Sequence, residues 1–196
     1  MVKLSLSKKA RLLDRLTAEQ KIVQMLFKYP GAGLTLSEIA SRAKVSKMNA
    51  SRILKKFKSQ DFINLKTLGK GEHIWRVTAN TESWIYKREK IIYNISELYR
   101  SGVIEYLNEY FHNPKSIILF GSFRYGQDTE DSDIDIAVES DEGLVETLSF
   151  KEFSEFEAAV GRKVKVHVFD KKNTETNLFR NIANGIVLSG FLEVSR

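Results

Sequence analysis

Two aspartates separated by a single residue are the side chains in this sequence best suited to chemistry. Asp133 and Asp135 lie in the segment 133–138, DIDIAV, whose remaining four residues are all apolar. Alternate residues of a strand project to the same face, about 7 Å apart. Two carboxylates placed in this way can hold one or two Mg²⁺ ions, which prefer carboxylate oxygens and the phosphates of a substrate. Such ions would orient an attacking oxygen and neutralise charge at a phosphorus atom that undergoes in-line displacement.

A glycine–serine pair ends the apolar run that comes before these aspartates. Gly121 and Ser122 follow the residues SIILF, and ten residues separate Ser122 from Asp133. Because glycine has no side chain to obstruct the approach, backbone amides and a hydroxyl can contact phosphate oxygens here. The connecting loop contains Arg124 and a second glycine, Gly126. We therefore expect Gly121, Ser122, Arg124 and Gly126 to bind a nucleotide.

The order of strand, Gly-Ser, short loop with glycine and Asp-x-Asp resembles the signature of the DNA polymerase β-like nucleotidyltransferase superfamily, in its minimal, MNT-type branch. The resemblance covers residues 103–192. It implies a nucleotidyltransferase-fold α/β domain with a mixed sheet, in which Asp133 and Asp135 are catalytic and bind Mg²⁺. It also implies transfer of a nucleoside monophosphate from a nucleoside triphosphate, with ATP as the expected donor, to a hydroxyl acceptor that the sequence does not identify.

Two departures from the family pattern bear on activity. The family has Ala-Arg before the second glycine, whereas Arg124 stands one place early here. The third family carboxylate is expected on a later strand, but the matching segment 164–169, VKVHVF, contains no acid. Lys165 and His167 share one face of this segment, and Asp170 follows it with the opposite parity. His167 could ligate metal as a neutral imidazole, Lys165 could neutralise phosphate, and a bulge could turn Asp170 toward the aspartates.

The missing carboxylate leaves two kinds of function open. The first, which we favour, is an enzyme that completes nucleotidyl transfer. The second is a protein with weak or no catalysis, either a nucleotide-binding transcriptional regulator or an antitoxin-like partner of a toxin, as some MNT-type relatives are. In this family the third carboxylate typically holds the metal that activates the attacking hydroxyl. Its absence therefore bears on catalysis more than on nucleotide binding.

Charge is distributed unevenly along the 196 residues, whose formal net charge is +6. Residues 1–100 hold 21 Lys and Arg against 8 Asp and Glu, a net +13, whereas residues 101–196 hold 10 against 17, a net −7. Such asymmetry favours a nucleic-acid-binding half joined to a half with another task.

Three helices and a hairpin are expected in the basic half. A helix over 17–28 precedes a second helix that Thr35 and Glu38 begin as a capping box, and Ser46 caps a third. Two strand-like runs then flank a Gly-bearing loop. This order resembles a winged helix-turn-helix over residues 15–78, which implies binding to double-stranded DNA. The candidate contacts on the third helix and the wing are Lys47, Ser51, Arg52, Lys55, Lys66 and Lys70.

Helices and strands alternate in the rest of the chain. A helix over 80–100 presents Ile85, Ile92, Ile95 and Tyr99 on one face, and the pattern resumes after Gly102. Later strands are expected at 116–120, 133–138, 163–169 and 186–188, with helices over 150–160 and 174–184. The fold class is α+β. The expected parts are a winged helix-turn-helix domain at 1–79, a helical connector at 80–102 and a nucleotidyltransferase-like domain at 103–196.

Several features exclude other classes of protein. The absence of cysteine excludes disulfides, a Cys-ligated zinc and a thiol nucleophile, and it fits a reducing cytoplasm. No apolar run approaches the length of a membrane span, and the first residues lack the apolar core of a signal peptide. We expect a cytoplasmic protein with no membrane partner, in which the helical stretch 80–111 forms a homodimer contact.

Overall fold

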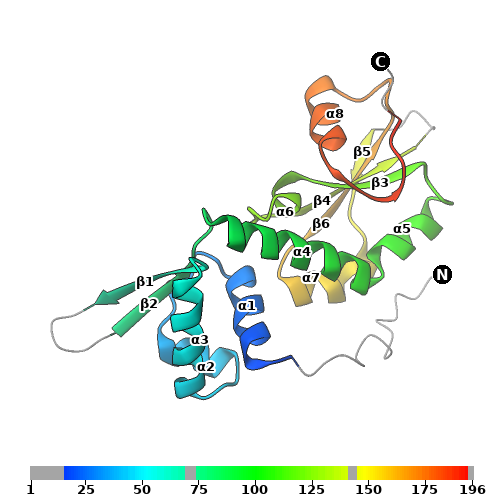
Figure 1. Ribbon diagram of the computed structural model, residues 1–196. Helices are drawn as coiled ribbons and strands as arrows, with labels where there is room; N and C mark the ends of the chain where they lie inside the picture. The colour runs from blue at the N-terminus through cyan, green and yellow to red at the C-terminus, as the bar shows by residue number, and fades with distance from the viewer. Residues whose placement is uncertain (1–15, 69–73, 141–144, 194–196) are drawn as a thin grey trace. The chain divides into compact units, whose positions relative to one another are not determined.

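The computed structural model describes residues 16–68, 74–140 and 145–193 (Figure 1). It divides between Lys90 and Ile91, inside helix α4 (Trp84–Ser101), into two compact units. The described residues up to Lys90 are called the N-terminal unit, and those from Ile91 onward the C-terminal unit. The limits expected for the connector, 80 and 102, stay a prediction. Within the described ranges, no helix combines the length and the apolar character that crossing a membrane requires.

The N-terminal unit contains the expected three helices and hairpin. The capping box expected at Thr35 and Glu38 is observed, and a second box, which was not predicted, joins Thr17 to Gln20. Leu34 also bridges the second hairpin strand, so the chain before the second helix joins the hairpin. The elements are α1 (Ala18–Lys28), α2 (Leu36–Arg42), α3 (Lys47–Ser59), β1 (Ile63–Leu68) and β2 (Ile74–Ala79), and the two strands are antiparallel.

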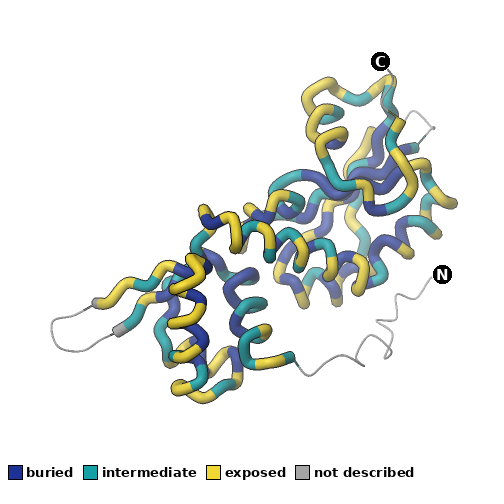
Figure 2. The backbone as a smooth tube through the Cα atoms, in the orientation of Figure 1, coloured by how far each residue is buried: buried dark blue, intermediate teal, exposed yellow. Residues whose placement is uncertain are grey.

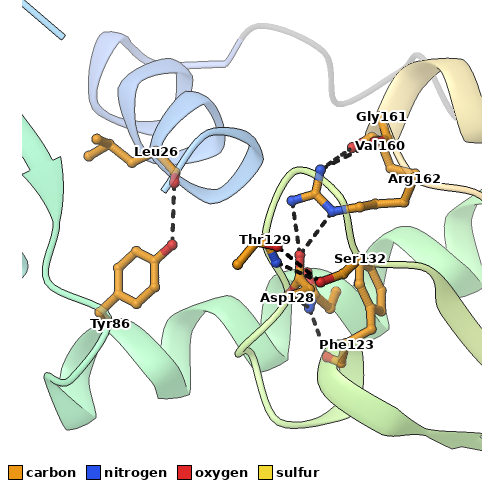
Figure 3. Close-up of polar contacts among 10 residues, drawn as sticks. Leu26, Tyr86, Phe123, Asp128, Thr129, Ser132, Val160, Gly161 and Arg162 are labelled. Carbon is orange, nitrogen blue, oxygen red and sulfur yellow. Dashed lines mark hydrogen bonds and ion pairs between the residues drawn. The ribbon is translucent and has the colours of Figure 1, made fainter. Parts of the chain in front are cut away.

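Aromatic rings occupy the core of the N-terminal unit. Phe62 lies between Phe57, at 5.1 Å between ring centroids, and Tyr86, at 5.2 Å. The hydroxyl of Tyr86 donates a hydrogen bond of 3.3 Å to the carbonyl of Leu26 (Figure 3). The first residues of α4 therefore belong to the core of the N-terminal unit. The sequence pattern placed the end of this domain at residue 79.

The apolar stripe expected along α4 is mostly wrong, because Ile95 packs against the core but the other three residues are exposed. Ile92 is 57% exposed and Tyr99 is 44% exposed, although both belong to that stripe. The side chains buried on this part of the helix are instead Asn94 and Leu98, four residues apart. Figure 2 shows α4 as a mixture of buried and exposed positions. The prediction failed because it treated apolar residues as the buried face, whereas here an asparagine is buried.

Among the described residues, the C-terminal unit contains a mixed sheet of five strands in the order β5-β6-β4-β3-β7. β4 and β6 are parallel, and the other neighbours are antiparallel. The elements are α5 (Val103–Tyr110), β3 (Ser116–Phe120), α6 (Gly121–Arg124), β4 (Ile134–Glu139), β5 (Glu146–Leu148), the 3₁₀ turn η2 (Lys151–Phe153), α7 (Ser154–Val160), β6 (Val164–Phe169), α8 (Thr176–Ala183) and β7 (Ile186–Gly190). The sequence predicted all four longer strands, but not the short edge strand β5.

The two faces of this sheet carry separate apolar layers. Ile117 and Leu119 of β3 pack with α5 and α7, whereas Ile118 and Phe120 pack with α8 (Figure 1). Because side chains alternate along a strand, the residues between the apolar positions of β4 and β6 project toward the α8 face. The aspartate of β4 lies on this face, with the lysine and histidine of β6.

Candidate functional site

The register of β3 and β4 brings the glycine–serine turn to the aspartates. Phe120 pairs with Asp135, so Gly121 begins its turn directly beside that carboxylate. Gly121 has a φ of 71°, and a Cβ atom added to it would lie 2.5 Å from Oδ2 of Asp135. Only glycine satisfies both the backbone conformation and the close approach. Gly121 thus lies against Asp135, Ser122 follows it in the same turn, and α6 is a single short turn within the expected loop.

Asp133 precedes β4 and pairs with a base from the neighbouring strand. The Nζ atom of Lys165 lies 2.5 Å from Oδ2 of Asp133. The pKa of Lys165 is raised because its ammonium donates a hydrogen bond to this carboxylate, and the charges of Asp133 and Asp135 add to the effect. Lys165 therefore carries its positive charge next to the position where a phosphate would meet the aspartates.

His167 contacts the other aspartate. Its Nε2 atom lies 3.1 Å from Oδ1 of Asp135, and its Nδ1 atom lies 3.2 Å from the hydroxyl of Thr147 on β5. The edge of the ring also packs against Phe120, with centroids 5.1 Å apart. Thr147 was not predicted, because β5 is a three-residue strand without an apolar pattern. The imidazole is thereby held from both ring nitrogens beside the carboxylate.

Asp170 does not lie with these residues. Its Oδ1 atom accepts hydrogen bonds from the backbone amides of Lys172, at 2.7 Å, and Asn173, at 3.1 Å. The pairing of β6 with β4 continues without a register shift from Val164 to Phe169, so no bulge turns Asp170 toward the aspartates. Of the three residues considered for the third position, the structure brings Lys165 and His167 to the site and uses Asp170 to cap a turn.

Arg124 presents an unsatisfied donor in the turn. Its guanidinium carbon lies 4.2 Å from the ring centroid of Tyr125, and its Nε atom is buried without a hydrogen-bond partner. Among the described residues, no other buried side-chain nitrogen or oxygen lacks a partner in this way. Gly126, with a φ of 64°, ends the turn. Since a buried unpaired N–H costs free energy, an acceptor oxygen from a ligand would stabilise this arrangement.

The donor set fits Mg²⁺. Asp133 and Asp135 supply carboxylate oxygens on one face, and Gly121 leaves space where any other residue would place a Cβ atom against Asp135. Mg²⁺ commonly binds one or two carboxylates and completes its shell with water and substrate phosphates. In the described residues no cluster of three acidic or histidine side chains is arranged to hold a metal alone.

A cavity of about 290 Å³ includes Asp133 in its lining. Its lining includes the carboxylates of Glu130, Asp131 and Glu157. Its two basic lining residues are already paired, since Arg162 contacts Asp128 and Lys163 contacts Glu157. Carboxylates repel a triphosphate. The lining of this cavity is therefore poorly suited to a triphosphate.

Three of the four predicted DNA-contacting residues of α3 are exposed. Ala50 and Leu54 are buried, whereas Lys47, Arg52 and Lys55 are exposed. Arg52 is oriented by its neighbour, because its Nη2 atom donates a hydrogen bond of 3.1 Å to Oδ1 of Asn49. Exposed cations on one helix are suited to contact phosphates and base edges in a major groove.

The other three predicted DNA contacts differ in their exposure and in whether the structure describes them. Ser51 of α3 is half-buried, and Lys66 of β1 is exposed. Lys70 lies outside the described residues. One basic residue of α3 is already engaged, because Lys56 pairs with Glu19 of α1 at 2.7 Å. Lys56 therefore links α3 to α1 and is not counted among the candidate DNA contacts.

Comparison with known families agrees with both units. Residues 100–187 match the family model described as nucleotidyltransferase domain, and residues 12–56 match the model described as Sigma-70, region 4, a helix-turn-helix module. No curated protein and no solved structure matches the chain. The first match spans both the glycine–serine turn and the aspartates, and the second spans α1, α2 and most of α3. The chain thus joins a helix-turn-helix region of DNA-binding type to a nucleotidyltransferase domain.

Proposed function

We propose that the C-terminal unit transfers a nucleoside monophosphate from ATP to a hydroxyl acceptor in a Mg²⁺-dependent reaction. The observation that carries this proposal is the close approach of Gly121 to Asp135. It brings the turn proposed to bind phosphate beside one of the two carboxylates proposed to bind metal. The match of residues 100–187 to the nucleotidyltransferase domain supports it. The acidic charge near Asp133 is then functional, because a cation and a triphosphate would meet there.

Each group in the site has a role in this reaction. Gly121, Ser122 and Arg124 bind the triphosphate, and Asp133 and Asp135 would hold Mg²⁺, which supplies positive charge that neutralises the phosphates when it is bound. The acceptor oxygen forms a bond to the α-phosphorus while the bond from that phosphorus to the bridging oxygen of the β-phosphate breaks. Pyrophosphate leaves with the electron pair of that bond, and the hydroxyl proton passes to solvent.

Incubation of the full chain with α-labelled ATP, Mg²⁺ and an extract of candidate acceptors tests the enzyme assignment. Labelled product is expected with the wild type and not with Asp133→Asn or Asp135→Asn. Glu155→Gln is the matched control, because Glu155 is an exposed carboxylate of α7 outside the site. Activity that persists in both aspartate variants would contradict the roles proposed for these residues.

A second candidate function is a nucleotide-dependent regulator that does not turn its ligand over. The pairing of both aspartates with bases of β6 favours it, because Lys165 and His167 stand where the family pattern expects a carboxylate. A nucleotide can regulate DNA binding only if it binds two states of the protein differently. DNA affinity that is equal with and without ATP and Mg²⁺ would remove the basis for this candidate.

The N-terminal unit is proposed to bind double-stranded DNA through α3 and the hairpin. The exposed cations Lys47, Arg52 and Lys55 support this proposal, as does the Sigma-70, region 4 match. The triple variant with alanine at these positions should lose most of its affinity for random duplex at low salt, measured by mobility shift. Lys58→Ala is the control, since Lys58 is an exposed cation in the last turn of the same helix.

A cytoplasmic homodimer is also proposed. The exposed apolar side chains of Ile92 and Tyr99 on α4 support a contact between copies, because large apolar side chains are stabilised by burial. Winged-helix proteins often bind paired half-sites as dimers. Light scattering at micromolar concentration should give twice the 22.5 kDa mass of one chain. A monomer mass under these conditions would contradict the dimer.

A further inference from the structure

A buried polar cluster lies beneath the nucleotide-binding turn, within the C-terminal unit. Asn94 is 1% exposed, and the side chains of Asp128 and Arg162 are each 2% exposed. The Nδ2 atom of Asn94 donates to Oδ1 of Asp128 at 3.0 Å, while Nε and Nη2 of Arg162 donate to Oδ2 of Asp128 at 3.2 and 3.0 Å (Figure 3). Both carboxylate oxygens of Asp128 are therefore occupied.

The cluster also holds backbone carbonyl groups. Asn94 donates a second hydrogen bond, of 2.8 Å, to the carbonyl of Phe123. The Nη1 atom of Arg162 lies 3.4 Å from the carbonyl of Val160 and 3.3 Å from that of Gly161. Buried charges and amides are retained at low cost only when they are hydrogen-bonded in this way. The cluster thus has one well-defined geometry and joins segments that are distant in sequence.

Each segment joined by the cluster leads to a site residue. Phe123 belongs to the α6 turn that Gly121 begins. Asp128 lies in the loop that ends at Asp133, and Arg162 precedes β6, the strand that contacts both aspartates. A set of apolar side chains could fill the same space without the desolvation of a charged pair. A buried polar network instead fixes a single arrangement of the groups around it.

We propose that Asn94, held by the Asp128–Arg162 ion pair, is a positioning residue that sets the Gly121–Gly126 turn for nucleotide binding. Asn94 contacts no proposed substrate group and acts only through the carbonyl of Phe123 and the carboxylate of Asp128. This inference rests on the proposed function, because it assumes that the turn binds a nucleotide. It assigns a role to a helix that the family signature does not include.

The test compares Asn94→Ala with Leu98→Ala in the full chain. Leu98 lies one turn further along α4 and is fully buried in the apolar core that also contains Phe123, so its truncation destabilises the unit without removing a hydrogen bond that holds the turn. The dissociation constant of a fluorescent ATP analogue with Mg²⁺ is expected to rise about tenfold in Asn94→Ala, equivalent to about 1.4 kcal/mol. It should change little in Leu98→Ala, although that variant has the lower melting temperature.

Hydrogen exchange of the nucleotide-free protein provides a readout that does not depend on binding. Amides of residues 121–128 should exchange faster in Asn94→Ala, while those of β3 and β4 keep their protection. Asn94→Ser, a milder truncation, should give an intermediate effect in both measurements. If the wild type binds no nucleotide, the proposed function fails and exchange alone decides the positioning role. Unchanged exchange at the turn, or equal loss of affinity in Leu98→Ala, would overturn the inference.

Discussion

At the scale of single residues, Gly121 meets two constraints at one atom. Its positive φ disfavours any residue with a Cβ atom. A Cβ atom added at this position would also lie too close to Oδ2 of Asp135. Asp135 in turn contacts His167, so a displaced carboxylate would also lose this partner. The glycine therefore keeps the turn and the carboxylate in contact.

Gly121→Ala should abolish detectable binding of the fluorescent ATP analogue, because the methyl group must displace Asp135 or change the turn. The matched control is Gly33→Ala, since the nearest neighbour of a Cβ atom there is the Cδ atom of Arg76 at 4.0 Å. The control should keep wild-type affinity. Titration of the nucleotide against both variants makes the comparison, and normal binding by Gly121→Ala would show that the turn can move without loss.

His167→Asp should increase the response of the protein to Mg²⁺. Without metal, a carboxylate at this position lies next to Asp135, and like charges this close destabilise the fold. Mg²⁺ should reverse this effect, so its addition should raise the melting temperature more in His167→Asp than in the wild type or in His167→Asn. Transfer of label from ATP should increase in parallel if the third carboxylate limits catalysis. Equal responses to Mg²⁺ in all three proteins would contradict this explanation.

At the scale of elements, the two capping boxes differ in the group that accepts the hydrogen bond of the threonine amide, which is an amide in one and a carboxylate in the other. The side chain of Gln20 accepts a hydrogen bond of 2.8 Å from the amide of Thr17, and Glu38 accepts one of 2.7 Å from the amide of Thr35. Only Glu38 ionises. Its pKa is lowered from the ordinary value of 4.5, first by the backbone amide of Thr35 and then by the hydroxyl of the same residue.

The sign of the pH effect follows from this lowered pKa. Ionised Glu38 stabilises the folded state above its ordinary pKa, and this contribution is lost as the pH falls through the lower folded-state pKa. Glu38→Gln reproduces the box at Thr17 and removes the contribution that depends on pH. The wild type should therefore melt at a higher temperature than Glu38→Gln at pH 7, and the two curves should converge in acid. A constant difference across this range would exclude ionisation as its cause.

The elements also show which patterns can be read locally. The start of α2 was predicted from Thr35 and Glu38 because a capping box is complete within four residues. The buried face of α4 was not predictable, because Asn94 is buried only through partners at Phe123 and Asp128. A polar side chain in a helix normally indicates a solvent-exposed face, and nothing near Asn94 in the sequence reverses that expectation.

At the scale of the whole molecule, the basic charge of residues 1–100 predicts a strong salt dependence of DNA binding. A protein that contacts about six phosphates loses roughly 10³-fold in affinity between 50 and 200 mM salt, because binding releases counterions. Mobility shifts over this range should show such a loss, and removal of Lys47 or Lys55 should reduce the slope by about one. A slope that is unchanged in both variants would argue against phosphate contacts by α3.

The amino-acid sequence alone determined what depends on neighbouring residues and on composition. It predicted three helices with a hairpin, the charge difference between the halves, and the pairing of a glycine–serine turn with an Asp-x-Asp strand. The family matches at residues 12–56 and 100–187 confirm a helix-turn-helix region and a nucleotidyltransferase domain, and the structure confirms the hairpin.

Only the tertiary structure decided which side chains meet across the sheet. It placed Lys165 against Asp133 and His167 against Asp135, turned Asp170 away, and buried Asn94 beneath the turn. The contacts of Lys165 and His167 each join residues 32 positions apart, and both depend on strand register and on the parity of a single position. Local patterns carry no information about such distances, because the free energy of a buried polar contact is set by its partners and not by its neighbours in the chain.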